Sequence, residues 1–251
     1  MKKKASDRRC PTGIQGLDEL IEGGFPRGRT ILVSGCCGTG KTILATQFIY
    51  QGAVEYNEPG VLVLLEQNPD EFKEDMLEFD FDLEKLETEG KLIIIDASLS
   101  RVSVEDVIGC IPVSSKSFSI LPGERDIRKL LDVVRRAADK IGAKRASIDS
   151  IPALDVMVKD KTEARRLILD MNYKLKSANL TTVLVSETDT DFPTEGVEKY
   201  IVDGVISLSY RTSGPDAGRT LIIEKMRRTS HSEEIHTLKF EKGAGIKIVK
   251  E

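Results

Sequence analysis

One stretch, G-C-C-G-T-G-K-T at residues 35–42, limits the fold of this chain more than any other feature. It matches the pattern G-x-x-x-x-G-K-[ST], and it stands between the apolar run "RTILVS" and the helical pattern "KTILATQFIYQ", the strand–loop–helix context that a phosphate loop needs. Glycines at three positions let the backbone curl so that N–H groups point at a phosphate, and the following helix adds the positive end of its dipole. The stretch predicts a P-loop nucleotide site.

Residues of this loop have distinct predicted roles. Lys41 places a cation between the β- and γ-phosphates, and the Thr42 hydroxyl binds Mg²⁺. Backbone N–H groups at the start of the helix complete the cradle. The predicted nucleotide-binding residues are Gly35, Cys36, Cys37, Gly38, Thr39, Gly40, Lys41, Thr42 and Ile43.

The two adjacent cysteines, Cys36 and Cys37, occupy variable positions of the loop. Adjacent cysteines lack the spacing of zinc ligands, so we interpret them as small side chains that fill a tight turn. The alternative is that a thiolate near a helix N-terminus becomes sensitive to oxidation. The four cysteines of the chain form no C-x-x-C pair, which favours a reduced, cytoplasmic protein.

Short β-branched apolar runs alternate with helical patterns along most of the chain. Apolar strands that alternate with helices favour an α/β fold with a largely parallel central sheet covered by helices on both faces. Helices are predicted at 41–51 and 125–141. The predicted strands are Thr30–Ser34, Gly60–Leu65, Leu92–Asp96, Arg145–Asp149, Thr182–Ser186 and Gly204–Leu208.

The C-terminal part follows a different pattern. "VISLSY", "RTLIIEKM" and "IHTLKF" follow one another with only turn residues between them, which predicts an antiparallel extension of the sheet. We expect residues 10–251 to form a single domain, with residues 1–9 as a flexible basic tail and residues 99–122 as an inserted loop. No apolar run reaches the roughly 18 residues that a membrane span needs.

A phosphate loop needs acidic partners, and two are predicted at strand ends. Asp149 closes the run "RASID" and is expected to hold Mg²⁺ through water. Glu66 follows the first strand after the loop, at the edge where open α/β sheets gather their ligands. We expect Glu66, with Lys41, to act in catalysis by orienting or deprotonating the attacking water. The alternative for Glu66 is a solvated carboxylate that caps the next helix.

These motifs together resemble the KaiC-like branch of the RecA-type ATPases. The resemblance covers nearly the whole chain, from "TGIQGLDELIEGGFPRGRTILVSG" through "GCCGTGKT", "VLVLLEQ", "ASIDSIPAL", "TTVLVSE" and "GVEKYIVDGVISL" to "EKMRRTSH". It implies a RecA-like P-loop NTPase fold that binds ATP or ADP with Mg²⁺. It also implies a homo-oligomeric ring, usually a hexamer, with ATP bound between neighbouring subunits.

The last of these segments resembles the family's K-x-R-G-x-x-H element. The resemblance implies that Lys225, Arg227 and His231 reach from one subunit to the nucleotide of the next. Two cations separated by one residue on a strand point to the same face, and trans arginines elsewhere contribute on the order of 10³–10⁵ in rate. The alternative is a solvated basic edge strand.

Two positions depart from the family pattern. Gln67 stands where the family usually has a second glutamate, and an amide cannot accept a proton as a carboxylate does, so we expect slow hydrolysis or hydrolysis that depends on Glu66 alone. Arg228 replaces the usual glycine of the trans segment, which puts the local geometry of that segment in question.

Three functions compete at this point. The first is a slow, ring-forming ATPase that acts as a nucleotide-dependent switch for an unidentified protein partner. The second is a recombinase-like protein that binds single-stranded DNA, which is disfavoured because the segment "ETDTDFPTE" has no lysine or arginine to replace counterions. A net charge of −4 also argues against a general polyanion surface. The third is a module that binds ATP with little or no hydrolysis, as Gln67 suggests.

Overall fold

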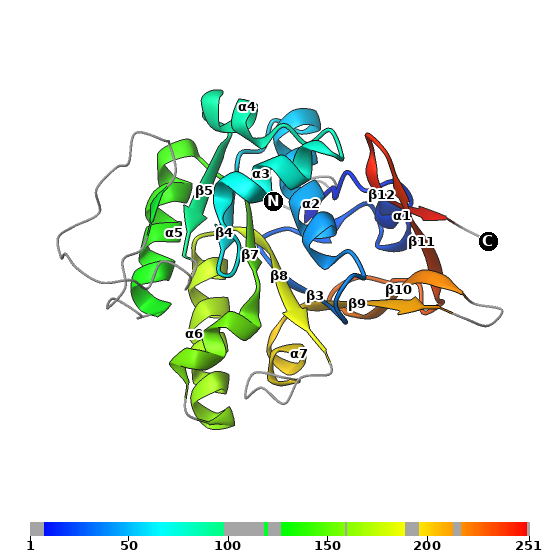
Figure 1. The fold of residues 1–251 in the computed structure, drawn as a ribbon. Helices are drawn as coiled ribbons and strands as arrows, with labels where there is room; N and C mark the ends of the chain where they lie inside the picture. Colours follow the sequence, from blue (N-terminus) through cyan, green and yellow to red (C-terminus); the bar gives the residue numbers. More distant parts are fainter. Residues whose placement is uncertain are drawn as a thin grey trace, which may run out of the picture.

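The computed structural model describes residues 8–97, 118–119, 127–158, 160–188, 196–212 and 217–249. Within them, ten strands form one sheet in the order β12-β11-β10-β9-β3-β8-β7-β4-β5-β6, and β1 pairs with β2 in a separate antiparallel ribbon (Figure 1). The strands are β1 (Arg9–Cys10), β2 (Phe25–Pro26), β3 (Thr30–Gly35), β4 (Gly60–Leu64), β5 (Leu92–Asp96), β6 (Phe118–Ser119), β7 (Arg145–Asp149), β8 (Thr181–Glu187), β9 (Gly204–Arg211), β10 (Gly218–Met226), β11 (His236–Glu241) and β12 (Gly245–Val249).

The part of the sheet from β9 to β6 is parallel, as the sequence predicted. Its register brings the ends of several strands to one edge: Gly35 pairs with Glu187, and Leu64 pairs with Asp149. The phosphate loop therefore leaves β3 at the same edge as the residues that end β7 and β8. Open α/β sheets bind ligands at this carboxyl edge.

The predicted antiparallel extension is confirmed. β9 lies parallel to β3 but antiparallel to β10, and β10, β11 and β12 continue as antiparallel neighbours. The strand β12 was not predicted. Its side chains Ile246 and Ile248 are buried against the core, which explains why the extension continues past "IHTLKF".

Helices cover both faces of the sheet (Figure 1). The helices are α1 (Leu17–Leu20), α2 (Lys41–Glu55), α3 (Pro69–Leu77), α4 (Leu83–Thr88), α5 (Ile127–Ile141), α6 (Lys161–Ser177) and α7 (Val197–Ile201), with a 3₁₀ helix at Ile151–Met157. Neighbouring residues of β3 point to opposite faces: Ile31 and Val33 join the cluster with α2, α3 and α4, whereas Leu32 joins the cluster with α5, α6 and α7. This alternation makes a strand buried on both faces apolar throughout.

Helix α2 begins differently from α3 and α6. Asn68 caps α3 by accepting from the Asp70 N–H at 2.8 Å, and Asp160 caps α6 in the same way. Gly40 precedes α2 and provides no side-chain cap. The first N–H groups of α2 therefore remain available to a ligand at the carboxyl edge of the sheet.

Two predicted segments fall largely outside the described residues. Of the expected tail at 1–9, residues 1–7 lie outside, but Arg9 belongs to β1 and donates to Thr229 Oγ1 at 2.6 Å, so the tail boundary was placed too late. Of the expected insertion at 99–122, only Phe118–Ser119 is described, and it pairs with β5 as strand β6.

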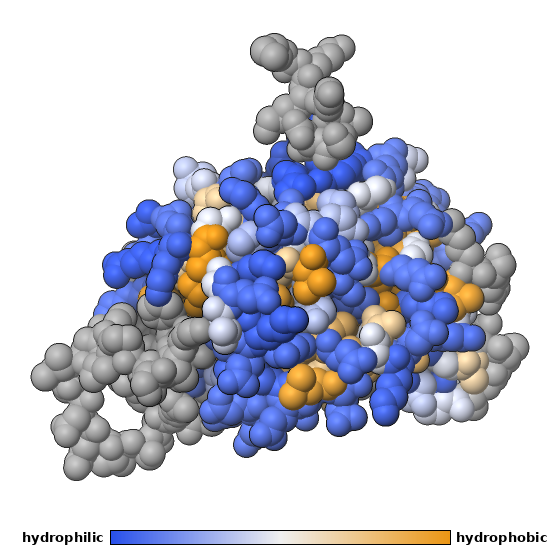
Figure 2. Space-filling view, turned by 90° about the horizontal axis from the view of Figure 1, so that it is seen from above, coloured by the Kyte–Doolittle hydropathy of each residue, from blue (hydrophilic) through white to orange (hydrophobic). Residues whose placement is uncertain are grey.

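None of the helices in the described part is both long enough and apolar enough to cross a bilayer. On the face drawn in Figure 2, hydrophilic residues predominate and apolar residues form separate patches.

Candidate functional site

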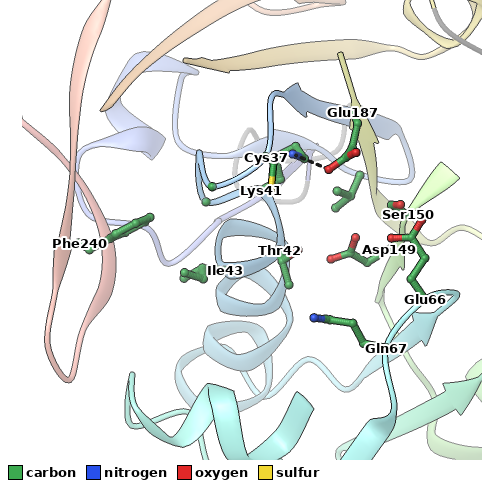
Figure 3. A pocket seen from close by; sticks show the side chains of 13 residues that line it. Cys37, Lys41, Thr42, Ile43, Glu66, Gln67, Asp149, Ser150, Glu187 and Phe240 are labelled. Atoms are coloured by element: carbon green, nitrogen blue, oxygen red, sulfur yellow. Dashed lines mark ion pairs between the residues drawn. The ribbon is translucent and has the colours of Figure 1, made fainter. Parts of the chain in front are cut away.

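A cavity of about 330 Å³ opens at the carboxyl edge of the parallel sheet. The phosphate loop and the start of α2 form one side of it, and residues at the ends of β4, β7 and β8 form the other (Figure 3). The lining residues are Cys37, Gly38, Gly40, Lys41, Thr42, Ile43, Glu66, Gln67, Asp149, Ser150, Val185, Glu187 and Phe240.

Most of the predicted loop residues lie at this cavity, but three do not line it. Gly35 is buried at the end of β3, Thr39 is buried with its hydroxyl donating to the Cys36 carbonyl at 2.8 Å, and Cys36 is exposed outside the lining. The loop places its backbone and Lys41 toward the cavity while these three residues support its turn.

Two glycines of the loop lie where neighbouring atoms leave little room for a side chain. Gly40 has a φ of +103°, and a Cβ there would lie 2.7 Å from the ring of Phe240. A Cβ on Gly35 would collide with the carbonyl oxygen of Leu208 on β9. A side chain at Gly35 would push the loop away from β9, and one at Gly40 would displace the Phe240 ring and strain a backbone of positive φ.

Among the described residues, Lys41 is the basic side chain that lines the cavity. Its side chain is only 7% exposed, and its Nζ donates to the Cys36 carbonyl at 2.8 Å. The Glu187 carboxylate lies 3.6 Å from the same Nζ (Figure 3). Glu187 was not predicted as a site residue, although it ends an apolar strand at the same edge as Asp149, a pattern that could have identified it.

Thr42 and Asp149 form the oxygen-rich corner of the cavity. The Thr42 hydroxyl donates to the Asp149 carboxylate, and the two side chains point toward each other in Figure 3. Burial raises the pKa of Asp149 to about 6; the Thr42 hydrogen bond and Lys41 oppose the shift, and Glu66 and Glu187 add to it. A hydroxyl and a carboxylate are hard oxygen donors of the kind that Mg²⁺ prefers, so these residues fit the predicted metal.

Glu66 lies two residues beyond the end of β4, beside Asp149. The hydrogen bond from Leu65 N–H to the Asp149 carbonyl, 2.7 Å long, ties the ends of β4 and β7 together. Partial desolvation raises the pKa of Glu66, the Ser150 hydroxyl and Lys41 oppose the shift, and the charge of Glu187 adds to it. Gln67 lines the same cavity as its neighbour Glu66. The predicted positions of both residues are therefore consistent with the geometry.

The C-terminal extension contacts the phosphate loop through Arg219. Its Nε donates to the Gly38 carbonyl at 3.0 Å. Its guanidinium carbon lies 4.5 Å from the centre of the Tyr210 ring and 4.4 Å from that of Phe240. Stacking of this kind stabilises a cation between aromatic faces. No sequence pattern had indicated that β9, β10 and β11 would reach the loop.

The three residues predicted to act in trans do not line the cavity of their own chain. Lys225 Nζ donates to the carbonyls of Val202 (2.7 Å) and Lys199 (3.0 Å), and burial followed by the charge of Arg227 lowers its pKa. His231 Nδ1 lies 2.9 Å from the Ser232 carbonyl.

The prediction that strand alternation places Lys225 and Arg227 on the same face was wrong in one respect. β10 ends at Met226, where its partner β9 begins at Gly204, so Arg227 lies beyond the strand. Arg227 instead lies 3.7 Å from Asp203, which is 1% exposed and also pairs with Arg29 and Lys176. Asp203, not strand alternation, holds Arg227 near Lys225.

Comparisons with known proteins agree with this geometry. The family model described as "ATPase: KaiC" matches residues 10–251. A UPF0273 protein of Methanocaldococcus jannaschii is 38% identical over 232 residues, which are 91% of each chain. The circadian clock oscillator protein KaiC of Thermosynechococcus vestitus is 34% identical over 96% of this chain, which spans 44% of that protein.

A similar fold is found in a solved structure of another protein. The crystal structure of a KaiC-like protein from the hyperthermophilic archaeon Pyrococcus horikoshii superposes with a TM-score of 0.79 at 35% sequence identity. The match covers 97% of this chain and 99% of that one. The likeness therefore includes the antiparallel extension as well as the parallel sheet.

Proposed function

The chain belongs to the KaiC family of ATPases, and from that premise we propose that it is a slow, Mg²⁺-dependent ATPase. Its ring of subunits would act as a nucleotide-dependent switch for a protein partner. Family membership supports a nucleotide-binding ATPase; the slow rate, the metal, the ring and the partner are parts of the proposal.

One observation carries the proposal: Lys41, Thr42, Asp149 and Glu66 line a single cavity although they come from three separate parts of the chain. Lys41 would neutralise charge on the β- and γ-phosphates, and the free N–H groups at the start of α2 would bind phosphate oxygens. Thr42 directly and Asp149 through water would hold Mg²⁺, which stabilises phosphate charge when bound.

Glu66 is suited to handle the attacking water. A general base works best when its pKa lies near the operating pH, and the raised pKa of Glu66 moves it in that direction. Gln67 next to it cannot accept a proton. A single carboxylate of this kind supports hydrolysis that is slow rather than absent.

The positions of the basic side chains support a ring of subunits. Among the described residues, Lys41 is the basic side chain that lines the cavity, while three carboxylates lie there with it. Arg227 lies outside the cavity with a side chain 54% exposed. In the proposed hexamer, Lys225, Arg227 and His231 of one subunit contact the nucleotide of its neighbour, where an arginine stabilises charge that develops during phosphoryl transfer.

Two other functions remain as alternatives. Gln67 in the cavity favours, as second candidate, a module that binds ATP with little or no hydrolysis. Binding of single-stranded DNA has less support, because the residue that opens the acidic segment, Glu187, pairs with Lys41, and residues 189–195 of that segment lie outside the described chain. We place the protein in the cytoplasm, where ATP is available and the exposed thiols of Cys36 and Cys37 stay reduced.

Phosphate release from Mg-ATP, with mass measured by light scattering in the same samples, tests the proposal. We expect turnover that rises as a hexamer forms. A monomer that binds ATP and releases no phosphate would favour the binding module. Unchanged ATP affinity in Lys41→Ala would contradict the phosphate-loop assignment itself.

A further inference from the structure

The cysteines of the described chain divide into two kinds. Cys10 is fully buried, and burial raises the pKa of its thiol to about 11. Cys36 and Cys37 are exposed and form no disulfide within the described residues, and both belong to the phosphate loop. A thiol reagent in solution can therefore reach the two loop cysteines but not Cys10.

Cys36 and Cys37 differ in their position relative to the cavity. Cys37 lines it, together with Lys41 and Thr42 (Figure 3), whereas Cys36 is not among the lining residues. The Cys36 sulfur lies 3.7 Å from the hydroxyl of Thr188, beyond the end of β8. Of these two neighbouring thiols, that of Cys37 thus lies at the cavity and that of Cys36 lies outside it.

The backbone couples Cys37 to the residues that would hold phosphate. The carbonyl of Cys36, which forms the peptide bond to Cys37, accepts from Lys41 Nζ and from Thr39 Oγ1, each at 2.8 Å. A group attached to the Cys37 sulfur would stand beside the Lys41 ammonium, in a cavity of about 330 Å³. A phosphate chain needs the same space.

A separate observation indicates that this cavity is built for a ligand. Ser150, 3% exposed, lines it; its hydroxyl lies close enough to the Glu66 carboxylate to lower the pKa of Glu66, but it has no hydrogen-bond partner of ordinary geometry among the described residues. Buried hydroxyls are usually satisfied by protein, water or ligand. A ligand that offers Ser150 a better-placed partner than Glu66 would share the cavity with Cys37.

We propose that Cys37 is a thiol-modification site whose adduct and bound nucleotide exclude each other. The reagent class is a small disulfide or related sulfur electrophile. The Cys37 thiolate attacks one sulfur of the disulfide, a new S–S bond forms to Cys37, the original S–S bond breaks, and the other half leaves as a thiolate that takes a proton from water. A small thiol reverses the reaction by the same exchange.

The inference rests on the proposed nucleotide site. It predicts that the adduct prevents nucleotide binding and that bound nucleotide prevents modification. A Cys37 adduct would block ATP, and bound ATP would shield Cys37 from the reagent. Cys36 would be modified without either effect, because it lies outside the lining. Cys36 is therefore a matched control for Cys37 within the same chain.

The test uses the full chain with Cys110→Ser, which removes the cysteine outside the described residues. Methyl methanethiosulfonate transfers the small group S–CH₃ to the thiolate and releases methanesulfinate, and peptide mass spectrometry locates the added group. We expect modification of Cys36 and Cys37 but not Cys10, and Mg-ATP should slow modification of Cys37 only. Calorimetric titration with ATP should show about tenfold or greater loss of affinity after treatment, and dithiothreitol should restore it.

Two variants decide between the cysteines. Each is compared with itself before and after treatment, so that any effect of the substitution cancels. Cys36→Ser should keep the sensitivity of ATP binding to the reagent, and Cys37→Ser should lose it. Recovery with dithiothreitol excludes irreversible unfolding as the cause.

The possible failures are distinguishable. If untreated protein does not bind ATP, the proposed function is wrong and the competition fails with it. If untreated protein binds ATP but ATP leaves the modification of Cys37 unchanged, or if Cys37→Ser stays as sensitive as Cys36→Ser, the modification site is wrong while the nucleotide site stands.

Discussion

The Lys41 ammonium lies 3.6 Å from the Glu187 carboxylate, in a cavity that also contains Asp149 and Glu66 (Figure 3). Within the described chain, three carboxylates thus share one cavity with a single ammonium. Mutual repulsion contributes to the raised pKa of both Asp149 and Glu66. A site of this charge favours a bound cation, and it makes Glu187 a competitor of phosphate for Lys41.

Glu187→Gln should therefore strengthen ATP binding. The neutral amide no longer holds Lys41, and because Glu187 is 40% exposed, the gain should be only about 1.5- to 5-fold in affinity. Calorimetric titration at low and high salt measures it, and the gain should shrink at high salt. Glu84→Gln, which removes the same charge from the exposed surface of α4, is the control. Weaker binding would mean that Glu187 supports the nucleotide complex.

Glu66→Gln should separate binding from hydrolysis. Loss of a general base lowers turnover by about 10²–10⁴, while ATP affinity should stay within about threefold because phosphate binding depends on Lys41 and the loop. Phosphate release and calorimetric titration measure the two quantities. Gln67→Glu is the matched change at the neighbouring position and should raise turnover. Turnover that survives Glu66→Gln would assign the base elsewhere.

Arg227→Ala should remove catalysis from the neighbouring subunit. We expect turnover to fall by about 10³ or more with ATP still bound. The fold should persist, because Asp203 keeps Arg29 and Lys176 as partners. Arg165→Ala, on the exposed side of α6, controls for the loss of charge.

A mixture of Arg227→Ala and Lys41→Ala subunits tests whether the contact is made in trans. In such rings some interfaces combine an intact Lys41 with an intact Arg227, so mixing should restore part of the turnover that each variant lacks alone. No recovery in mixed rings would indicate that Arg227 acts within its own chain.

Arg228→Gly should stabilise the protein. Arg228 has a φ of +64°, a left-handed conformation that costs a residue with a Cβ about 1–2 kcal/mol. Glycine removes this cost but gains freedom in the unfolded chain, so we expect a net gain of about 0.5–1 kcal/mol in the free energy of unfolding. Urea denaturation measures it. Arg228→Ala keeps the Cβ and should show no such gain; equal stabilisation by alanine would place the effect in the side chain.

The ion pair between buried Arg145 and partly buried Glu58 should make stability depend on pH. Arg145 is fully buried, and its Nε and a terminal guanidinium nitrogen each lie 2.8 Å from Glu58 Oε2. Burial alone would raise the pKa of Glu58, but the charges and hydrogen bonds of Arg145 and Arg27 lower it below its usual value. The stabilisation is therefore present above the usual pKa of about 4.3 and is lost as pH falls through the lowered folded value.

Glu58→Gln tests this dependence by urea denaturation across the pH range. The variant should be less stable than the parent by about 3–5 kcal/mol at pH 7, because it leaves Arg145 buried without a charged partner. The difference should shrink as the pH falls below about 4. Glu84→Gln, at an exposed site, should change stability by less than about 0.5 kcal/mol at any pH. A constant difference for Glu58→Gln would contradict the pKa argument.

Much of the fold could be predicted from the sequence, because parallel strands buried on both faces have a distinctive composition. The predicted strand 145–149 matches β7, and the predicted helix at 41–51 lies within α2. Helix ends were less accurate, since α2 continues to Glu55. Arg228 had been noted only as a departure from glycine; its positive φ explains why glycine is usual there.

What the sequence by itself determined is the local chemistry of the site: a glycine loop, Lys41 and Thr42 in one turn of chain, and acidic residues at strand ends. What only the tertiary structure decided is which distant residues join them. Glu187 enters the cavity because β8 pairs with β3 in a register that sets Gly35 opposite Glu187. Phe240 and Arg219 reach the loop because the antiparallel extension folds back over it. Strand register and long-range packing depend on the whole core, whereas a loop of eight residues carries its geometry in its own glycines.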